Sequence, residues 1–162
     1  EAIRLAKQTS GLDHALSANK TRLIDLLQAS PAVVLLSKTG VGPVTAAICY
    51  ATWSHHGRIR SEAAFAALAG VSPVPASSGN TVRHRLSRGG DRRLNRALHM
   101  AVVTRMIHDH ATRAYVDKRR AEGRTNREIR RCLKRYLARQ IYRDLNTASR
   151  ANEQTPARTC ET

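Results

Sequence analysis

A short glycine-rich turn constrains the fold of this chain more than any other feature. The apolar pair Leu35-Leu36 precedes Gly40-Val41-Gly42-Pro43, and a run of small residues follows through Ala47. Glycine accepts φ above zero and lets another backbone approach closely, whereas proline suits the first turn of a helix. The segment therefore predicts a helix-hairpin-helix whose second helix begins at Pro43.

The start of that second helix suits an anion. The first amides of a helix have no partner within the helix and point outward. Gly40, Gly42 and Thr45 are therefore candidate contacts for a phosphate. The alternative is a tight connection between two helices that binds nothing.

The charge of the chain favours a nucleic acid as the partner. The 162 residues carry a formal net charge of +16, and residues 83–143 hold 19 Lys and Arg against five Asp and Glu. Most of these are arginines, which contact phosphate in a bidentate way. A solvated basic surface is the alternative, and a membrane surface is disfavoured because no Trp or Phe face opposes the basic segments. The candidate contacts are Arg83, Arg85, Arg88, Arg92, Arg93, Arg96, Arg130, Arg131, Lys134 and Arg135.

Length and composition fit one domain, or a domain with an arm. No apolar run reaches the length of a transmembrane helix, and the first residues lack a signal-peptide pattern.

The three cysteines are far apart with no C-x-x-C pair, so we expect neither a zinc site nor disulfide bonds. This use of cysteine is typical of a reducing cytoplasm. Because the chain starts at Glu1 rather than Met, we expect an interior cut in a longer polypeptide.

Hydrophobic periodicity predicts a mainly α fold. Residues 3–28 form a helix with leucines near heptad spacing and Asn19 as a polar position in the seam. Gly11 interrupts this pattern, so the helix alternatively begins near Leu12 with Ser10 as its cap. The helix is either a coiled coil or an amphipathic helix that packs on the domain. The expected division is a coiled-coil-like helix over 1–30, a helical domain over 31–145 and a disordered tail over 146–162.

Capping residues mark the later helices. Ser61 caps a short helix through Leu68, with Phe65 and Leu68 facing inward, and Asp91 caps a long helix that ends by Gly123. Thr125 and Glu128 form a capping box before a last helix, whose apolar residues recur every four positions. Residues 81–86 alternate polar and apolar, which predicts a short β-strand or an extended arm.

A proline-bounded loop over 73–79 contains Ser77 and Ser78, and arginines follow it. Its spacing alone indicates a turn, and His84 is a base candidate only by proximity. The acidic residues are few and unclustered, so the chain alone is not expected to hold a complete metal site. The segment His108-Asp109-His110 is not expected to bind a metal either, because helix positions two apart do not share a face, so both rings could hardly reach one ion.

Four segments carry a resemblance to a known family. They are residues 40–47, 65–73, 78–79 and 88–98, in this order. The stretch from about Leu35 to Met106 resembles the C-terminal domain of IS110/IS116/IS902 family transposases.

The resemblance implies a DNA recombinase of a bacterial insertion sequence, located in the cytoplasm at the nucleoid. It implies that Ser78 is the nucleophile, with Ser77 as an adjacent alternative. It further implies a RuvC-like domain that binds Mg²⁺, oligomers formed through a coiled coil, and a structured guide RNA. This chain lacks the RuvC-like domain, so we expect no cofactor in the chain and no independent activity. Two alternatives remain: a non-catalytic helix-hairpin-helix module for DNA or structured RNA, and a structural RNA-binding protein of the ribosomal type.

Overall fold

Helices make up most of the computed structural model, which describes residues 1–75, 84–87 and 89–154. The mainly α prediction is confirmed. The described elements are α1 (Ala2–Gln28), α2 (Val33–Leu36), α3 (Pro43–Trp53), α4 (Glu62–Leu68), β1 (Pro73–Pro75), β2 (His84–Leu86), α5 (Arg92–His108), α6 (His110–Ala121) and α7 (Asn126–Gln154).

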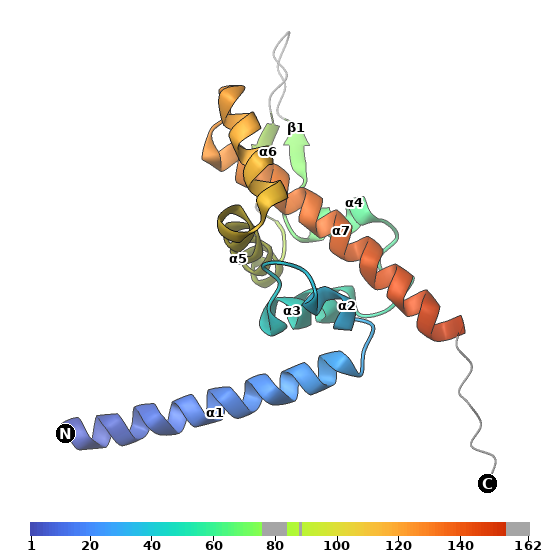
Figure 1. Cartoon of the computed structure of the whole chain (residues 1–162). Helices are drawn as coiled ribbons and strands as arrows, with labels where there is room; N and C mark the ends of the chain where they lie inside the picture. The colour runs from blue at the N-terminus through green and yellow to red at the C-terminus, as the bar shows by residue number, and fades with distance from the viewer. Residues whose placement is uncertain (76–83, 88, 155–162) are drawn as a thin grey trace.

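Helix α1 projects from the rest of the molecule, and only its C-terminal end packs against it (Figure 1). Leu27 is buried there, whereas Leu12 and Leu16 are 59% and 66% exposed. The alternative start near Leu12 is wrong, because the helix runs through Gly11 from Ala2. An exposed glycine weakens a helix by about 1 kcal/mol but does not stop one with good helix formers on both sides.

The core lies where α3, α4, α5 and α7 meet. Trp53 and Phe65 are almost fully buried at its centre, so two of the few aromatic residues contribute to a core that is otherwise aliphatic. The Trp53 indole N–H donates to Asn146 Oδ1 at 3.2 Å, which satisfies its polar group and ties α3 to α7.

The predicted cap of α4 is confirmed, since Ser61 Oγ accepts from the Ala64 amide at 3.1 Å. Phe65 is buried as predicted, but Leu68 remains 39% exposed. Ala69 takes the inward position instead, because it lies four residues after Phe65 on the same side of the chain.

The long helix expected from Asp91 to Gly123 is instead two helices. Asp91 caps α5 as predicted, accepting from the amides of Arg93 and Leu94. At Asp109 the backbone is extended, and its carboxylate accepts from the Thr112 amide at 2.8 Å. The same acidic residue therefore ends α5 and caps α6, because a side-chain acceptor replaces helical pairing at that point.

The capping box before α7 is confirmed. Glu128 Oε2 accepts from the Thr125 amide at 2.9 Å, and Thr125 Oγ1 accepts from the Glu128 amide at 3.3 Å. The helix then continues to Gln154, so residues 146–154 are helical where the sequence predicted the start of a disordered tail. Its buried face reaches past Asn146, since Ser149 is still buried. Residues 155–162 lie outside the described residues.

A small antiparallel hairpin connects α4 to α5. Strand β1 pairs with β2 in the register Pro73 to Leu86, which confirms a short strand within residues 81–86. The backbones of Gly70 and Gly90 cross at the foot of this hairpin, and a Cβ on Gly90 would lie 2.3 Å from the Gly70 nitrogen. The Asp91 amide donates to the Leu68 carbonyl at 2.7 Å beside the crossing. The two ends of the hairpin are thus held together.

Candidate nucleic-acid interface

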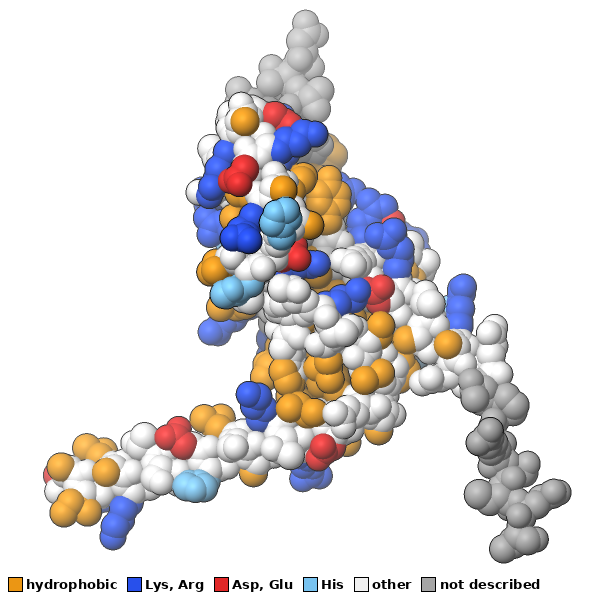
Figure 2. Space-filling model, viewed as in Figure 1, with side chains coloured by type: hydrophobic (Ala, Val, Ile, Leu, Met, Phe, Trp, Pro, Cys, Tyr) orange, Lys and Arg blue, Asp and Glu red, His pale blue; other side chains and the backbone are white. Residues whose placement is uncertain are grey.

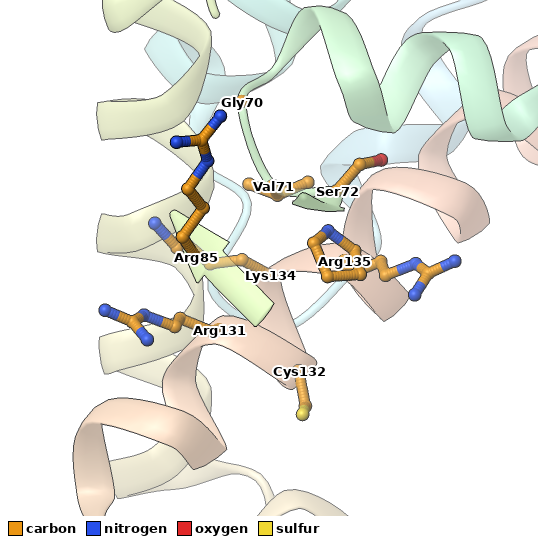
Figure 3. Close-up of a pocket in the computed structure, with 9 residues that line it drawn as sticks. Gly70, Val71, Ser72, Arg85, Arg131, Cys132, Lys134 and Arg135 are labelled. Carbon is orange, nitrogen blue, oxygen red and sulfur yellow. The ribbon is translucent and has the colours of Figure 1, made fainter. Parts of the chain in front are cut away.

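A cationic pocket lies at the foot of the β1–β2 hairpin. It has a volume of about 120 Å³ and is lined by the segment after α4, by β2 and by α7. The charged ends of Arg85, Lys134 and Arg131 follow one another along one side in Figure 3, whereas Arg135 extends on the other side. The remaining lining residues are Gly70, Val71, Ser72, Pro73 and Cys132, so none of the described residues that line the pocket is acidic.

Lys134 is held in this pocket by an asparagine of α5. Its ammonium donates to Asn95 Oδ1 at 3.0 Å, and Asn95 Nδ2 donates in turn to the Ala69 carbonyl at 2.7 Å. Burial, reinforced by Arg131 and Arg130, lowers the pKa of the Lys134 ammonium. An anion in the pocket would offset both the burial and the repulsion.

His99 lies one turn beyond Asn95 on α5. Burial is the main cause that lowers the pKa of its imidazole, and the charges of Lys134 and Arg130 lower it further. The neutral ring is therefore favoured in the folded protein, which limits the positive charge beside the pocket.

The His99 environment predicts a pH dependence of stability. A lowered pKa in the folded state means that the unfolded chain binds the proton first as the pH falls below the ordinary value of 6.5. The contribution of His99 to the free energy of unfolding is complete above that pH and is lost below it. Denaturant unfolding at pH 7.5 and pH 5 should show a larger acid destabilisation for the wild type than for His99→Gln. An equal pH dependence of the two proteins would contradict the prediction.

The other predicted site residues fall into two groups, those that the structure describes and those that lie outside the described residues. Arg92, Arg93 and Arg96 are exposed in the first turns of α5, next to the hairpin foot, and Arg130 precedes the pocket residues of α7. The predicted residues Ser77, Ser78, Arg83 and Arg88 lie outside the described residues. The structure thus brings Arg85, Arg131, Lys134 and Arg135 together at the segment that leads into the serine loop. Figure 2 shows Lys and Arg side chains concentrated on the part of the molecule above α1.

The glycine-rich turn packs against α5 and is tied to α7. Gly40 has φ of +80° and lies so close to α5 that a Cβ would be 2.5 Å from the Ala101 carbonyl oxygen. Val41 is buried, and the Lys38 ammonium pairs with the Asp144 carboxylate of α7 at 2.8 Å. Gly42 is different, because it is exposed, caps α3 without a side-chain hydrogen bond and has free space around its Cα. Gly40 therefore serves helix packing, while Gly42 and the partly exposed Thr45 stand at the free helix start.

Sequence reasoning missed Asn95 and His99 as parts of the pocket region. Their spacing of four on α5 places both on one face of that helix, which is the signal that could have grouped them. The crossing of Gly70 and Gly90 had no comparable signal, because it joins residues 20 positions apart.

In the part of the chain that the structure describes, no cluster of three or more His, Cys, Asp or Glu side chains has an arrangement that could hold a metal ion. Within those same residues, no helix combines the length and hydropathy needed to cross a bilayer.

An α-helical domain with a cationic pocket of this kind is a domain suited to binding phosphate groups. Residues 32–117 match the Transposase IS116/IS110/IS902 family, and the chain belongs to that family. It is 34% identical over 124 residues to the insertion element IS110 uncharacterized 43.6 kDa protein of Streptomyces coelicolor. It is 30% identical over 124 residues to the insertion element IS900 uncharacterized 42 kDa protein of Mycobacterium paratuberculosis. Each alignment covers 75% of this chain but 31% of the relative, so the chain spans about a third of either protein.

Proposed function

We propose that this chain is the serine-bearing, DNA-binding domain of an insertion-sequence transposase that cleaves and rejoins DNA strands. Membership of the transposase family supports the general activity. The observation that carries the proposal is the cationic pocket, since its β1 and β2 lining residues flank the segment that contains Ser77 and Ser78. A phosphodiester held there would be bound by residues that precede and follow, in the sequence, the segment proposed to supply the nucleophile.

The proposed chemistry is a transfer of one phosphoryl group to Ser78 and back. The Ser78 Oγ–phosphorus bond forms as the bond from phosphorus to one bridging oxygen of the DNA strand breaks. The hydroxyl proton leaves Oγ, and the departing strand end takes up a proton to become a hydroxyl. Attack by a strand hydroxyl on the phosphoserine reverses these steps, so the phosphodiester energy is kept for rejoining.

The pocket residues would stabilise charge during this transfer. Arg85, Arg131 and Lys134 supply positive groups from two different elements, and Asn95 orients the ammonium of Lys134. Preorganised cations of this kind stabilise the charge that develops on phosphoryl oxygens, because they need no rearrangement during the reaction. Arg135 on the opposite side of the pocket holds the strand.

The remaining parts of the proposal concern partners. We place the Mg²⁺ ligands in a RuvC-like domain outside this chain, where bound Mg²⁺ would supply further charge neutralisation. The exposed leucines of α1, including Leu12 and Leu16, are proposed to pair with a second copy. A structured guide RNA is the proposed selector of the DNA target, and the bacterial nucleoid is the proposed location.

Covalent trapping tests the role of Ser78 in a protein that joins this chain to the RuvC-like domain. With a nicked suicide DNA, the wild-type protein should form a denaturant-resistant adduct, and Ser78→Ala should reduce its formation by at least about 10³-fold, because nucleophile removal is among the most damaging changes in an enzyme. Ser77→Ala is the matched control and should retain the adduct. Equal DNA binding by both variants shows that they are folded.

Two outcomes would overturn the assignment. An undiminished adduct in Ser78→Ala, or a loss confined to Ser77→Ala, would remove Ser78 from the mechanism. If the wild-type protein forms no adduct while it binds DNA tightly, the non-catalytic binding module is the correct function.

A further inference from the structure

A second cationic groove lies away from the hairpin, where the loop between α3 and α4 meets the C-terminal half of α7. Four of its lining residues carry basic groups, namely His56, Arg60, Arg143 and Arg150, and its polar lining includes Ser61 and Thr147. Among the residues with described positions, no Asp or Glu lines this groove. None of these four residues was singled out by the sequence as a binding residue.

Specific contacts fix the shape of this groove. The Tyr142 hydroxyl donates to the Ile59 carbonyl at 2.6 Å, which ties the loop to α7. Arg150 Nε donates to His56 Nε2 at 3.2 Å, which holds the guanidinium across the groove. Within the described residues, no ion pair includes Arg60 or Arg150, so their charges are free to meet an external anion.

The groove and the hairpin-foot pocket lie on the same side of α7. The groove is lined by residues between His56 and Ser61, just before α4, and the pocket by residues between Gly70 and Pro73, just after it. Because α4 packs along α7, both sites adjoin the α4 side of that helix. Midway, Glu62 of α4 hydrogen-bonds Arg139 and lies 3.4 Å from Arg143 Nε. The hydrogen bond from Arg139 is the main cause that lowers the pKa of the Glu62 carboxyl. Glu62 therefore offsets the charge of Arg139 and part of the charge of Arg143, whereas Arg60 and Arg150 form no ion pair among the described residues.

This charge pattern fits duplex DNA. Lys134 in the pocket and Asn146 in the groove are 12 positions apart, which is about 18 Å along a helix at 1.5 Å per residue. The major groove of B-DNA is about 12 Å wide between its walls, so the phosphates that flank it stand farther apart than that. The major groove of A-form RNA is narrow and deep, which fits this spacing less well.

We propose that the groove formed by residues 56–61 and α7 binds the phosphates of the second strand of duplex DNA, so that α7 spans a major groove between its two cationic ends. The neutral Glu62–Arg139 pair then faces the open groove, where no phosphate lies. This site is separate from the serine chemistry and does not depend on it.

The salt dependence of binding tests the site. The double variant Arg60→Gln, Arg150→Gln is compared with Arg4→Gln, Arg22→Gln, which removes two exposed arginines from α1. Binding of each protein to a 20-base-pair duplex of arbitrary sequence is measured by fluorescence anisotropy between 50 and 200 mM KCl. The groove variant should lose about 0.9 in the slope of log affinity against log salt for each phosphate contact removed, or about 1.8 in all. The control should lose less than half of that.

Equal slopes for the groove variant and the control would overturn the proposal. It would also be overturned if the groove variant bound duplex DNA like the wild type and lost affinity only for folded RNA or single-stranded DNA. The single variant Arg60→Gln, on an exposed loop position, should lose about 0.9 in slope and guards against misfolding of the double variant. Because binding alone is measured, failure here leaves the role of Ser78 standing.

Discussion

Replacing Gly90 with alanine is expected to lower the free energy of unfolding by more than about 3 kcal/mol. The added Cβ would lie 2.3 and 2.4 Å from the nitrogen and Cα of Gly70 and 2.9 Å from the Ala69 carbonyl carbon. All three are backbone atoms, so no side-chain rotation relieves the contact, and overpacking of this kind costs about 1–3 kcal/mol or more. The segments must separate, which also breaks the hydrogen bond from the Asp91 amide to Leu68.

Gly89→Ala is the matched control for this prediction. Its Cβ would meet nothing within 4 Å, so its unfolding free energy should stay within about 1 kcal/mol of the wild type. Thermal unfolding followed by circular dichroism should show a fall of roughly 6–12 °C for Gly90→Ala. Equal melting temperatures for the two variants would mean that the glycine crossing does not hold the hairpin foot.

Gly40→Ala is the second change with a large expected effect, about 3 kcal/mol of lost stability. Alanine at φ of +80° is strained by about 1–2 kcal/mol, and its Cβ would lie 2.5 Å from the Ala101 oxygen of α5. The adjoining Arg105 side chain is 3.0 Å away, so the turn must move off α5. Denaturant unfolding measures the loss.

Gly42→Ala separates packing from binding at the same turn. Gly42 has φ of −82° and free space at its Cα, so alanine should cost less than about 1 kcal/mol. If the two variants are destabilised equally, the packing role assigned to Gly40 is wrong. A Gly42→Ala protein with full stability and a lower DNA affinity would support a phosphate contact at the start of α3.

Local signals predicted the helices well. Ser61, Asp91 and Thr125 cap helices as the sequence indicates, because a capping side chain bonds to amides two or three residues away. The break at Asp109 followed the same chemistry but was missed, since apolar residues continue on both sides of it. The length of α7 was also missed, because its last turns are polar and packing rather than propensity sustains them.

The candidate site was predicted only in part. Arg85, Arg131, Lys134 and Arg135 were chosen for their charge, and the structure places them around one pocket. Asn95 and His99 belong to the same region, but their contacts reach Lys134, which is more than 30 positions away in sequence. Charge is a property of composition, whereas convergence depends on which helix faces pack together.

The sequence by itself determined the family, the helical class, most of the helix starts and the excess of positive charge, because each depends on residue type and short spacing. Tertiary structure alone decided where the basic side chains gather in space. It gathered one cationic group at the hairpin foot and another beside residues 56–61, and it neutralised Arg139 between them with Glu62. It also packed Gly40 against α5, since the space beside a glycine is set by the element that the fold packs against it.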